Sequence, residues 1–230
     1  MKRLLRLLVS LCIIGGLSTV STGAVDKTVA FTFDDGPSGR FTQQLLEGLE
    51  EREAKATFFL CGYRMELYPD LPAQILEAGH EVGLHGYSHD SMCQMSREQL
   101  EAELDKTQDF LYELTGKRVK TLRPPGGENS ELLRQVAQEK GLSLIHWSVD
   151  PRDWATQDCQ QVINNLLKEI EDGDIILMHD MSQSSVDAAL EVMDQLAKEG
   201  YRFVTVSELL TRNGEEMKPG CWYHKRSPSE

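Results

Sequence analysis

The feature that most constrains the fold is an alternation of short strand-like runs with longer helical segments. We expect strands, from apolar and β-branched runs, at residues 28–33, 56–60, 81–84, 119–122, 142–147, 174–178 and 203–206. Between them, apolar residues recur at helical spacing at residues 41–53, 72–78, 96–114, 130–139, 158–170 and 185–198. This alternation predicts βα units and an α/β fold with a mainly parallel sheet.

About seven such alternations suit a closed or nearly closed barrel of about seven parallel strands better than an open sheet. We expect one domain, residues 25–211, because no repeat and no evident linker interrupts the pattern. Residues 212–230 are polar and lack periodicity, so we expect them to form a loosely held C-terminal tail.

Residues 1–24 have the organisation of a secretory signal peptide. Lys2, Arg3 and Arg6 precede an apolar stretch at residues 7–16, and small residues follow at 22–24. The apolar stretch is short for a membrane span of about 20 residues, so we expect cleavage and no stable membrane insertion afterwards. An uncleaved anchor is the alternative. Either outcome predicts a secreted or cell-surface protein.

Charge and cysteine content exclude some classes and leave others open. The net charge of −13 argues against nucleic acid and against docking on anionic lipid, because both need a basic patch. A neutral substrate or a cationic product is compatible with this charge. After cleavage four cysteines remain, Cys61, Cys93, Cys159 and Cys221, which match no zinc-binding spacing. They form one or two disulfides or stay as free thiols, and we expect a monomer.

Five segments rich in functional side chains each lie at the end of a predicted strand. They are DDGP at 34–37, HGYSH at 85–89, RPPGG at 123–127, DPRDW at 150–154 and LMH at 177–179. In a parallel α/β barrel the loops that follow the strands share one face, and active sites lie there. The five segments are therefore expected to converge.

The residue types in these segments favour a metal-dependent hydrolase. His85 and His89, four residues apart, can share a face, and a carboxylate from the Asp34–Asp35 pair completes a three-ligand site with open positions. The second carboxylate of the pair can stay off the metal and accept a proton. His179 ends a strand, where a general acid is well placed. His80 precedes its strand and so lies at the wrong end.

Taken together, the five segments resemble the motifs of the polysaccharide deacetylase (NodB-homology) family, carbohydrate esterase family four. The resemblance covers about residues 28–210, and all five motifs occur in order. Two positions depart from the family pattern. Gly86 replaces the hydroxyl residue of the second motif, which removes a loop hydrogen bond worth about 1 kcal/mol. Gly126 stands where a tyrosine is common, which opens one wall of the site.

The resemblance implies a distorted (β/α) barrel and the roles of individual residues. Asp35, His85 and His89 would bind a divalent metal, zinc first, with cobalt or manganese as alternatives. Asp34 would be the general base, oriented by Arg123. His179 would be the general acid, supported by Asp150. The remaining implied roles are an acetyl-methyl pocket lined by Trp154 and Leu177, and an oxyanion donor at the N–H of Gly126.

The activity implied is removal of N-acetyl groups from N-acetylglucosamine-type residues of a glycan, peptidoglycan first or chitin-like oligomers. One alternative keeps the chemistry and changes the substrate to small acetylated amines or muramic acid units. Another class of function, a non-catalytic glycan-binding domain, would share the fold without turnover. The implied location is the bacterial cell envelope.

Overall fold

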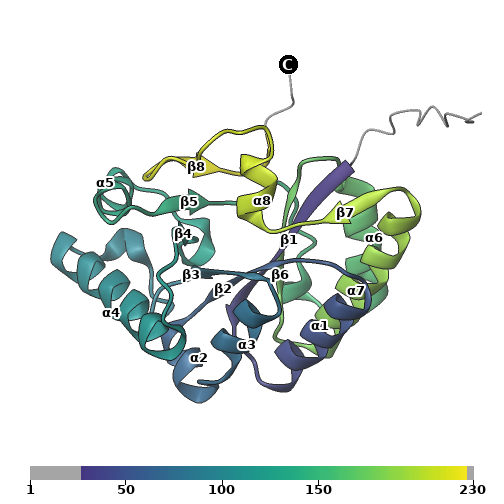
Figure 1. Cartoon of the computed structure of the whole chain (residues 1–230), viewed down its shortest axis with the longest axis horizontal. Helices are drawn as coiled ribbons and strands as arrows, with labels where there is room; N and C mark the ends of the chain where they lie inside the picture. Colours follow the sequence, from purple (N-terminus) through teal and green to yellow (C-terminus); the bar gives the residue numbers. More distant parts are fainter. Residues whose placement is uncertain (1–26, 227–230) are drawn as a thin grey trace, which may run out of the picture.

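The structure of the protein is a computed structural model that describes residues 27–226 (Figure 1). The predicted signal peptide at residues 1–24 lies outside the described residues. The strands are β1 (Lys27–Gly36), β2 (Thr57–Leu60), β3 (Glu81–Leu84), β4 (Thr121–Leu122), β5 (Ser143–Ile145), β6 (Ile175–His179), β7 (Tyr201–Phe203) and β8 (Trp222–Tyr223). The α-helices are α1 (Arg40–Glu51), α2 (Gly62–Leu67), α3 (Leu71–Glu77), α4 (Arg97–Thr115), α5 (Glu131–Glu139), α6 (Cys159–Glu169), α7 (Gln183–Lys198) and α8 (Val206–Thr211). Short 3₁₀ turns are η1 (Met92–Gln94), η2 (Pro125–Gly127) and η3 (Asp153–Ala155).

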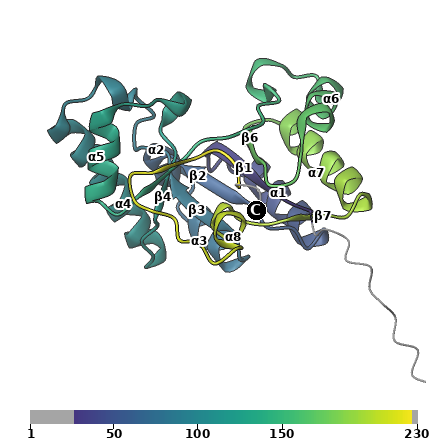
Figure 2. The ribbon, with the colours of Figure 1, turned by 90° about the horizontal axis from the view of Figure 1, so that it is seen from above.

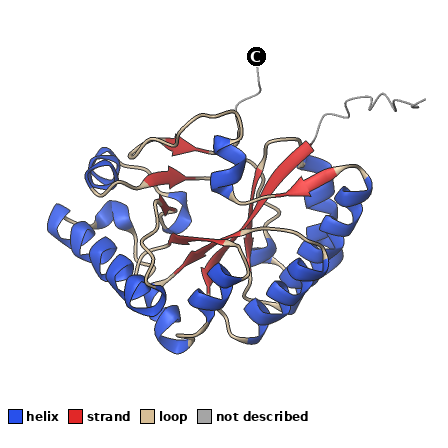
Figure 3. Cartoon of the chain, viewed as in Figure 1, coloured by secondary structure: helices blue, strands red, loops and turns tan. Residues whose placement is uncertain are grey.

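These strands form one curled sheet. Its order is β6-β1-β2-β3-β4-β5-β8, with β7 paired beside β1, and the paired strands run parallel. Isolated bridges from Val149 to Ile176 and from Asp174 to Lys225 bring the far side of the sheet back to β6. All the helices except α8 lie around the outside of the strands, and α8 packs against their inner residues (Figure 1 and Figure 3). The expected distorted (β/α) barrel in a single domain is therefore confirmed.

The core forms where the apolar faces of the helices meet the sheet. Phe31 and Phe33 of β1 and Phe58 of β2 are fully buried, and Phe33 stacks on Phe58. Helices α1 and α7 pack closely at Gly48, where an added Cβ would lie 2.5 Å from the Leu190 side chain. This packing fixes the strands, and with them the residues at the strand ends.

The C-terminal segment differs from the expectation of a loosely held tail. Strand β8 pairs with β5: the Leu144 N–H donates to the Cys221 carbonyl (2.9 Å) and the His146 N–H to the Tyr223 carbonyl (2.7 Å). Figure 2 shows this segment in yellow, running from α8 toward the β4 side of the sheet. The tail is therefore anchored to the sheet at β8 and at the Lys225 bridge. A two-residue edge strand is held by backbone hydrogen bonds, so its side chains carry no periodic pattern.

The described residues bear on two expectations, the state of the cysteines and the presence of a membrane-spanning helix. Cys61, Cys93, Cys159 and Cys221 are all free thiols, which is the second of the two alternatives left open by the sequence. Between residues 27 and 226, none of the helices combines the length and the apolar character that crossing a bilayer requires.

Candidate active site

The carboxyl-terminal ends of the strands bring together the side chains expected to act on a substrate. Asp34 and Asp35 end β1, and the register of the sheet places Asp34 beside His179 at the end of β6. His85 directly follows β3, and His89 lies four residues further along the same loop. The predicted convergence at one end of a parallel sheet is thus observed for these five residues.

Asp35, His85 and His89 form a cluster suited to a cation. The Asp35 Oδ1 atom lies 3.2 Å from His85 Nε2 and 3.0 Å from His89 Nε2. One ligand atom from each of the three residues falls within 4.8 Å of the others. Within the described chain, no other group of three or more such residues meets this criterion.

Hydrogen bonding around the cluster shows that these residues fit a divalent metal. His85 Nδ1 lies 2.7 Å from the Arg123 carbonyl, which can only accept, so Nδ1 carries the proton and the Nε2 lone pair faces Asp35. Asp35 Oδ1 is itself buried without a hydrogen-bond partner among the described residues. A lone pair opposite an unpartnered carboxylate oxygen is the arrangement that a cation satisfies. One carboxylate oxygen with two imidazole nitrogens is a common zinc donor set.

Asp34 is fixed by a buried ion pair. Its Oδ1 accepts a 2.7 Å hydrogen bond from Arg123 Nη1, and Asp34 and Arg123 are 3% and 0% exposed. The other guanidinium bonds run to the Thr32 hydroxyl and to the carbonyls of Ile145 and His146. Because four hydrogen bonds fix the guanidinium, including the one to Asp34, the Asp34 carboxylate is held in one orientation.

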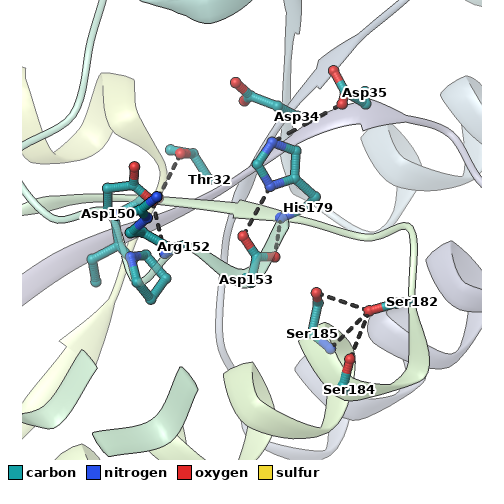
Figure 4. Close-up of polar contacts among 12 residues, drawn as sticks. Thr32, Asp34, Asp35, Asp150, Arg152, Asp153, His179, Ser182, Ser184 and Ser185 are labelled. Atoms are coloured by element: carbon teal, nitrogen blue, oxygen red, sulfur yellow. Dashed lines mark hydrogen bonds and ion pairs between the residues drawn. The ribbon is translucent and has the colours of Figure 1, made fainter. Parts of the chain in front are cut away.

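The partner of His179 is Asp153, so the expected pairing with Asp150 is wrong. Asp153 Oδ1 lies 2.9 Å from His179 Nδ1, and its Oδ2 accepts the His179 backbone N–H at 2.9 Å. Asp150 instead accepts the backbone N–H of Arg152 (2.8 Å). Arg152 adopts a left-handed conformation (φ 59°), which turns the chain so that the buried Asp153 faces β6. Figure 4 shows the His179 ring between Asp35 and Asp153, with Asp150 to one side.

Charges within the cluster shift two pKa values in opposite directions. Burial alone raises the pKa of Asp35, but the imidazole groups of His85 and His89 beside its carboxylate outweigh this effect and hold that pKa well below its ordinary value. Burial lowers the pKa of His179, yet the hydrogen bond and charge of Asp153, followed by the charges of Asp34 and Asp35, raise it to about 9. At neutral pH His179 is therefore an imidazolium whose Nε2–H is free to donate.

The three residues expected to contact substrate come from β6 and from the 3₁₀ turns that follow β4 and β5. Leu177 is a buried residue of β6, two positions before His179. Trp154 follows Asp153 in η3 and is 58% exposed, with the Arg152 guanidinium 5.3 Å from its ring centre. Gly126 lies in η2 with φ 66°, and an added Cβ there would meet open space. Their roles toward a substrate remain predictions.

Comparison with known proteins identifies the family. A family model described as polysaccharide deacetylase matches residues 22–145. A peptidoglycan-N-acetylglucosamine deacetylase of Bacillus cereus (strain ATCC 14579) is 40% identical over 190 residues, 80% of this chain and 89% of that protein. The peptidoglycan-N-acetylmuramic acid deacetylase PdaC of Bacillus subtilis (strain 168) is 38% identical over 193 residues; the match covers 84% of this chain but only 39% of PdaC.

The solved structures agree with this assignment. The structure of PdaC from Bacillus subtilis superposes with a TM-score of 0.77 at 35% identity, covering 80% of this chain and 90% of that chain. A family 4 acetyl xylan esterase from Clostridium thermocellum in complex with a cobalt ion gives a TM-score of 0.80 at 30% identity, covering 86% and 98%. On the match of the family model and of these relatives over most of its length, the chain belongs to the polysaccharide deacetylase family.

Proposed function

We propose that this protein is a metal-dependent hydrolase that removes N-acetyl groups from N-acetylglucosamine-type residues of a polysaccharide, with peptidoglycan as the first substrate to test. Family membership supports the reaction class. The Bacillus cereus and Bacillus subtilis relatives are named as peptidoglycan deacetylases, which supports peptidoglycan as the substrate. Chitin-like oligomers present the same acetylated amine and serve as a defined substrate.

Asp35, His85 and His89 would hold the metal in this proposal. When bound, a divalent cation supplies positive charge that polarises the acetyl carbonyl and makes water more acidic. Zinc is the first candidate for this donor set, and cobalt and manganese are the alternatives. The cobalt ion in the Clostridium thermocellum relative supports a divalent metal without selecting one.

Asp34 is proposed as the general base. Its carboxylate lies beside the cluster, with Oδ2 3.8 Å from His85 Nε2, while Arg123 holds Oδ1. An acid held off the metal in this way can take a proton from the water that attacks the acetyl carbon. Arg123 acts as a positioning residue, because its four hydrogen bonds leave Asp34 a single orientation.

His179 is proposed as the general acid. Asp153 holds Nδ1, so the Nε2–H group faces the cluster. The distance from His179 Nε2 to Asp35 Oδ2 is 4.0 Å. As the water oxygen bonds to the acetyl carbon and the C–N bond breaks, this proton passes to the leaving amine. The products are acetate and a glycan amine. The raised pKa of His179 keeps this proton in place at neutral pH.

Substrate contacts are proposed for the three flanking residues. Trp154 and Leu177 would line the pocket for the acetyl methyl group, and the N–H of Gly126 would donate to the developing oxyanion. The exposed ring of Trp154 supports a contact with a sugar face.

The observation that carries the proposal is that Asp34 and His179 both lie beside the Asp35 cluster, where Arg123 fixes Asp34 and Asp153 fixes His179. The test is acetate release from N-acetyl-chitooligosaccharides and from isolated cell walls in the presence of zinc, cobalt or manganese. Release from at least one glycan supports the proposal. No release from any glycan with any of the three metals contradicts it.

Two alternatives have their own tests. The name of PdaC favours muramic acid units as an alternative target, and product mass spectrometry on separated wall fragments and on small acetylated amines distinguishes the acetyl group removed. A non-catalytic glycan-binding domain would bind glycan equally well as wild type and as Asp34→Asn, with no acetate released by either.

We also propose export to the cell envelope. The predicted signal peptide at residues 1–24 supports it, and so does the wall substrate named for the relatives. Mass spectrometry of the protein recovered from culture medium and from the cell-wall fraction would show whether the mature chain begins near residue 25.

A further inference from the structure

The two histidines expected to bind the metal are supported very differently. His85 follows a strand, is 2% exposed and is fixed by the Arg123 carbonyl. The His89 side chain is 41% exposed and follows four loop residues outside any helix or strand. His89 also adopts a left-handed backbone (φ 65°), a conformation that is unfavourable for a non-glycine residue. Something outside the loop must therefore hold it.

A single carboxylate oxygen on α4 does so. Glu103 Oε1 accepts hydrogen bonds from the backbone N–H of Tyr87 (2.8 Å), the N–H of Ser88 (2.7 Å) and the Ser88 hydroxyl (2.8 Å). Hydrogen bonds to a charged acceptor are stronger than those between neutral groups. All three donors lie between Gly86 and His89.

The helix that carries Glu103 is itself firmly anchored. Leu100, Leu104 and Leu111 are buried in the core, and a capping box at Ser96 and Gln99 begins α4. The Thr107 hydroxyl also bonds to the Glu103 carbonyl (2.7 Å). Through these hydrogen bonds, Glu103 ties a loop that has no regular structure to a helix that is fixed in the core.

Gly86 explains why a distant carboxylate is needed. Its φ of 79° suits glycine, and an added Cβ would lie 3.0 Å from Met92 Cε and 3.3 Å from Glu103 Oε1. A hydroxyl residue at position 86 would have to displace the same oxygen that now accepts the loop's donors. The hydrogen bond that the sequence suggested was lost at Gly86 is replaced by three bonds to Glu103.

We propose that Glu103 is a positioning residue that holds the 86–89 loop so that His89 Nε2 reaches the Asp35 cluster. This inference rests on the proposed metal site, but its main readouts are made without substrate. Outer residues that orient metal ligands change metal affinity by about 10–100-fold when they are removed.

The experiment compares Glu103→Ala, the conservative Glu103→Gln and the matched control Glu113→Ala, an exposed glutamate on the same helix. Two quantities are measured: amide hydrogen exchange at Tyr87 and Ser88 in metal-free protein, and zinc affinity by competition with a chelator. We expect Glu103→Ala to lose amide protection and to bind zinc about 10–100-fold more weakly. Glu103→Gln should fall between this variant and wild type, and Glu113→Ala should match wild type.

Wild-type amide protection or wild-type zinc affinity in Glu103→Ala would overturn the inference. Thermal unfolding of the metal-free variants shows whether α4 is intact; if Glu103→Ala does not fold, the same two measurements on Glu103→Gln decide. A wild-type protein that releases no acetate on any glycan contradicts the proposed function, whereas the amide exchange still tests the loop contact.

Discussion

Glu81 and Asp35 are acids at opposite ends of the parallel strands, Glu81 at the start of β3 and Asp35 at the end of β1. Each Glu81 oxygen accepts two hydrogen bonds, in all from the Thr57 and Thr121 hydroxyls and from the N–H and hydroxyl of Ser207, at 2.7–3.3 Å. Asp35 Oδ1 is buried with no such partner in the described chain, and two imidazole nitrogens face it.

The histidines on either side of β3 differ in the same way. His80 precedes the strand, accepts the Ala56 N–H on Nδ1 (3.3 Å), and burial lowers its pKa to about 4. His85 follows the strand and turns an imidazole nitrogen toward a carboxylate oxygen. Glu81, whose two oxygens each accept two hydrogen bonds, stabilises the fold, whereas the unpartnered Asp35 oxygen is ready for a ligand. The amino-terminal end of the sheet is therefore assigned to stability and the carboxyl-terminal end to chemistry.

The largest expected effect is at the carboxyl-terminal end. His89→Ala should lower the rate of acetate release by at least about 100-fold, because the metal loses one of three ligands. The free energy of unfolding of the metal-free protein should fall by no more than about 1 kcal/mol, because the ring is substantially exposed and loses only its pairing with Asp35. Acetate assays, zinc titration and urea unfolding check both parts. A large loss of stability with activity retained would contradict the assignment of chemistry to the carboxyl-terminal end of the sheet.

The next effect concerns the proton donor. Asp153→Asn should lower kcat by about 10–100-fold. It should also move the alkaline limb of the pH profile to lower pH, because the loss of this carboxylate removes the principal contribution that raises the His179 pKa. Asp150→Asn is the matched control and should leave the profile in place. The same shift in Asp150→Asn, and not in Asp153→Asn, would contradict the observed pairing.

At the amino-terminal end of the sheet, Glu81→Ala should lower the free energy of unfolding and leave the catalytic rate nearly unchanged. It leaves the Ser207 N–H and two threonine hydroxyls without their acceptor, and we expect a loss of about 1–3 kcal/mol in the free energy of unfolding. The kcat measured below the unfolding temperature should stay within about twofold of wild type. Urea unfolding with acetate assays checks this, and a large fall in kcat at wild-type stability would contradict it.

The smallest effect is a pH dependence of stability at His80. The unfolded chain protonates this histidine near pH 6.5 and the folded chain only near pH 4, so the unfolded state binds more protons between these values. Its contribution to stability is therefore present above pH 6.5 and is lost as pH falls toward 4. His80→Gln should flatten this part of the curve of unfolding free energy against pH. An unchanged slope in His80→Gln would contradict the assignment.

The strand-end residues could be predicted from the sequence because parallel strands bring their carboxyl ends to one edge. Asp34, Asp35, His85 and His179 each directly end or follow a buried run, so their convergence needed no knowledge of loop shape. The choice between Asp150 and Asp153 did depend on loop shape. It follows from the left-handed backbone of Arg152, which the letters DPRDW do not reveal.

Other features escaped prediction for similar reasons. Residues 203–206 look like a strand because they are apolar or β-branched, yet β7 ends at Phe203 and a capping box of Thr205 and Glu208 begins α8. Glu103 lies in a helix that the sequence already predicts from its apolar spacing, so nothing in the sequence sets this glutamate apart from the other polar residues of the helix. Its contact with Ser88 spans 15 residues and becomes visible only in the folded chain.

The most direct test of the central claim is titration of metal-stripped wild-type protein with zinc while acetate release from N-acetyl-chitooligosaccharides is followed. The stripped protein should release no acetate, and activity should return and saturate at one equivalent of zinc, with zinc binding lost in His89→Ala. Undiminished acetate release by the stripped protein would contradict the account.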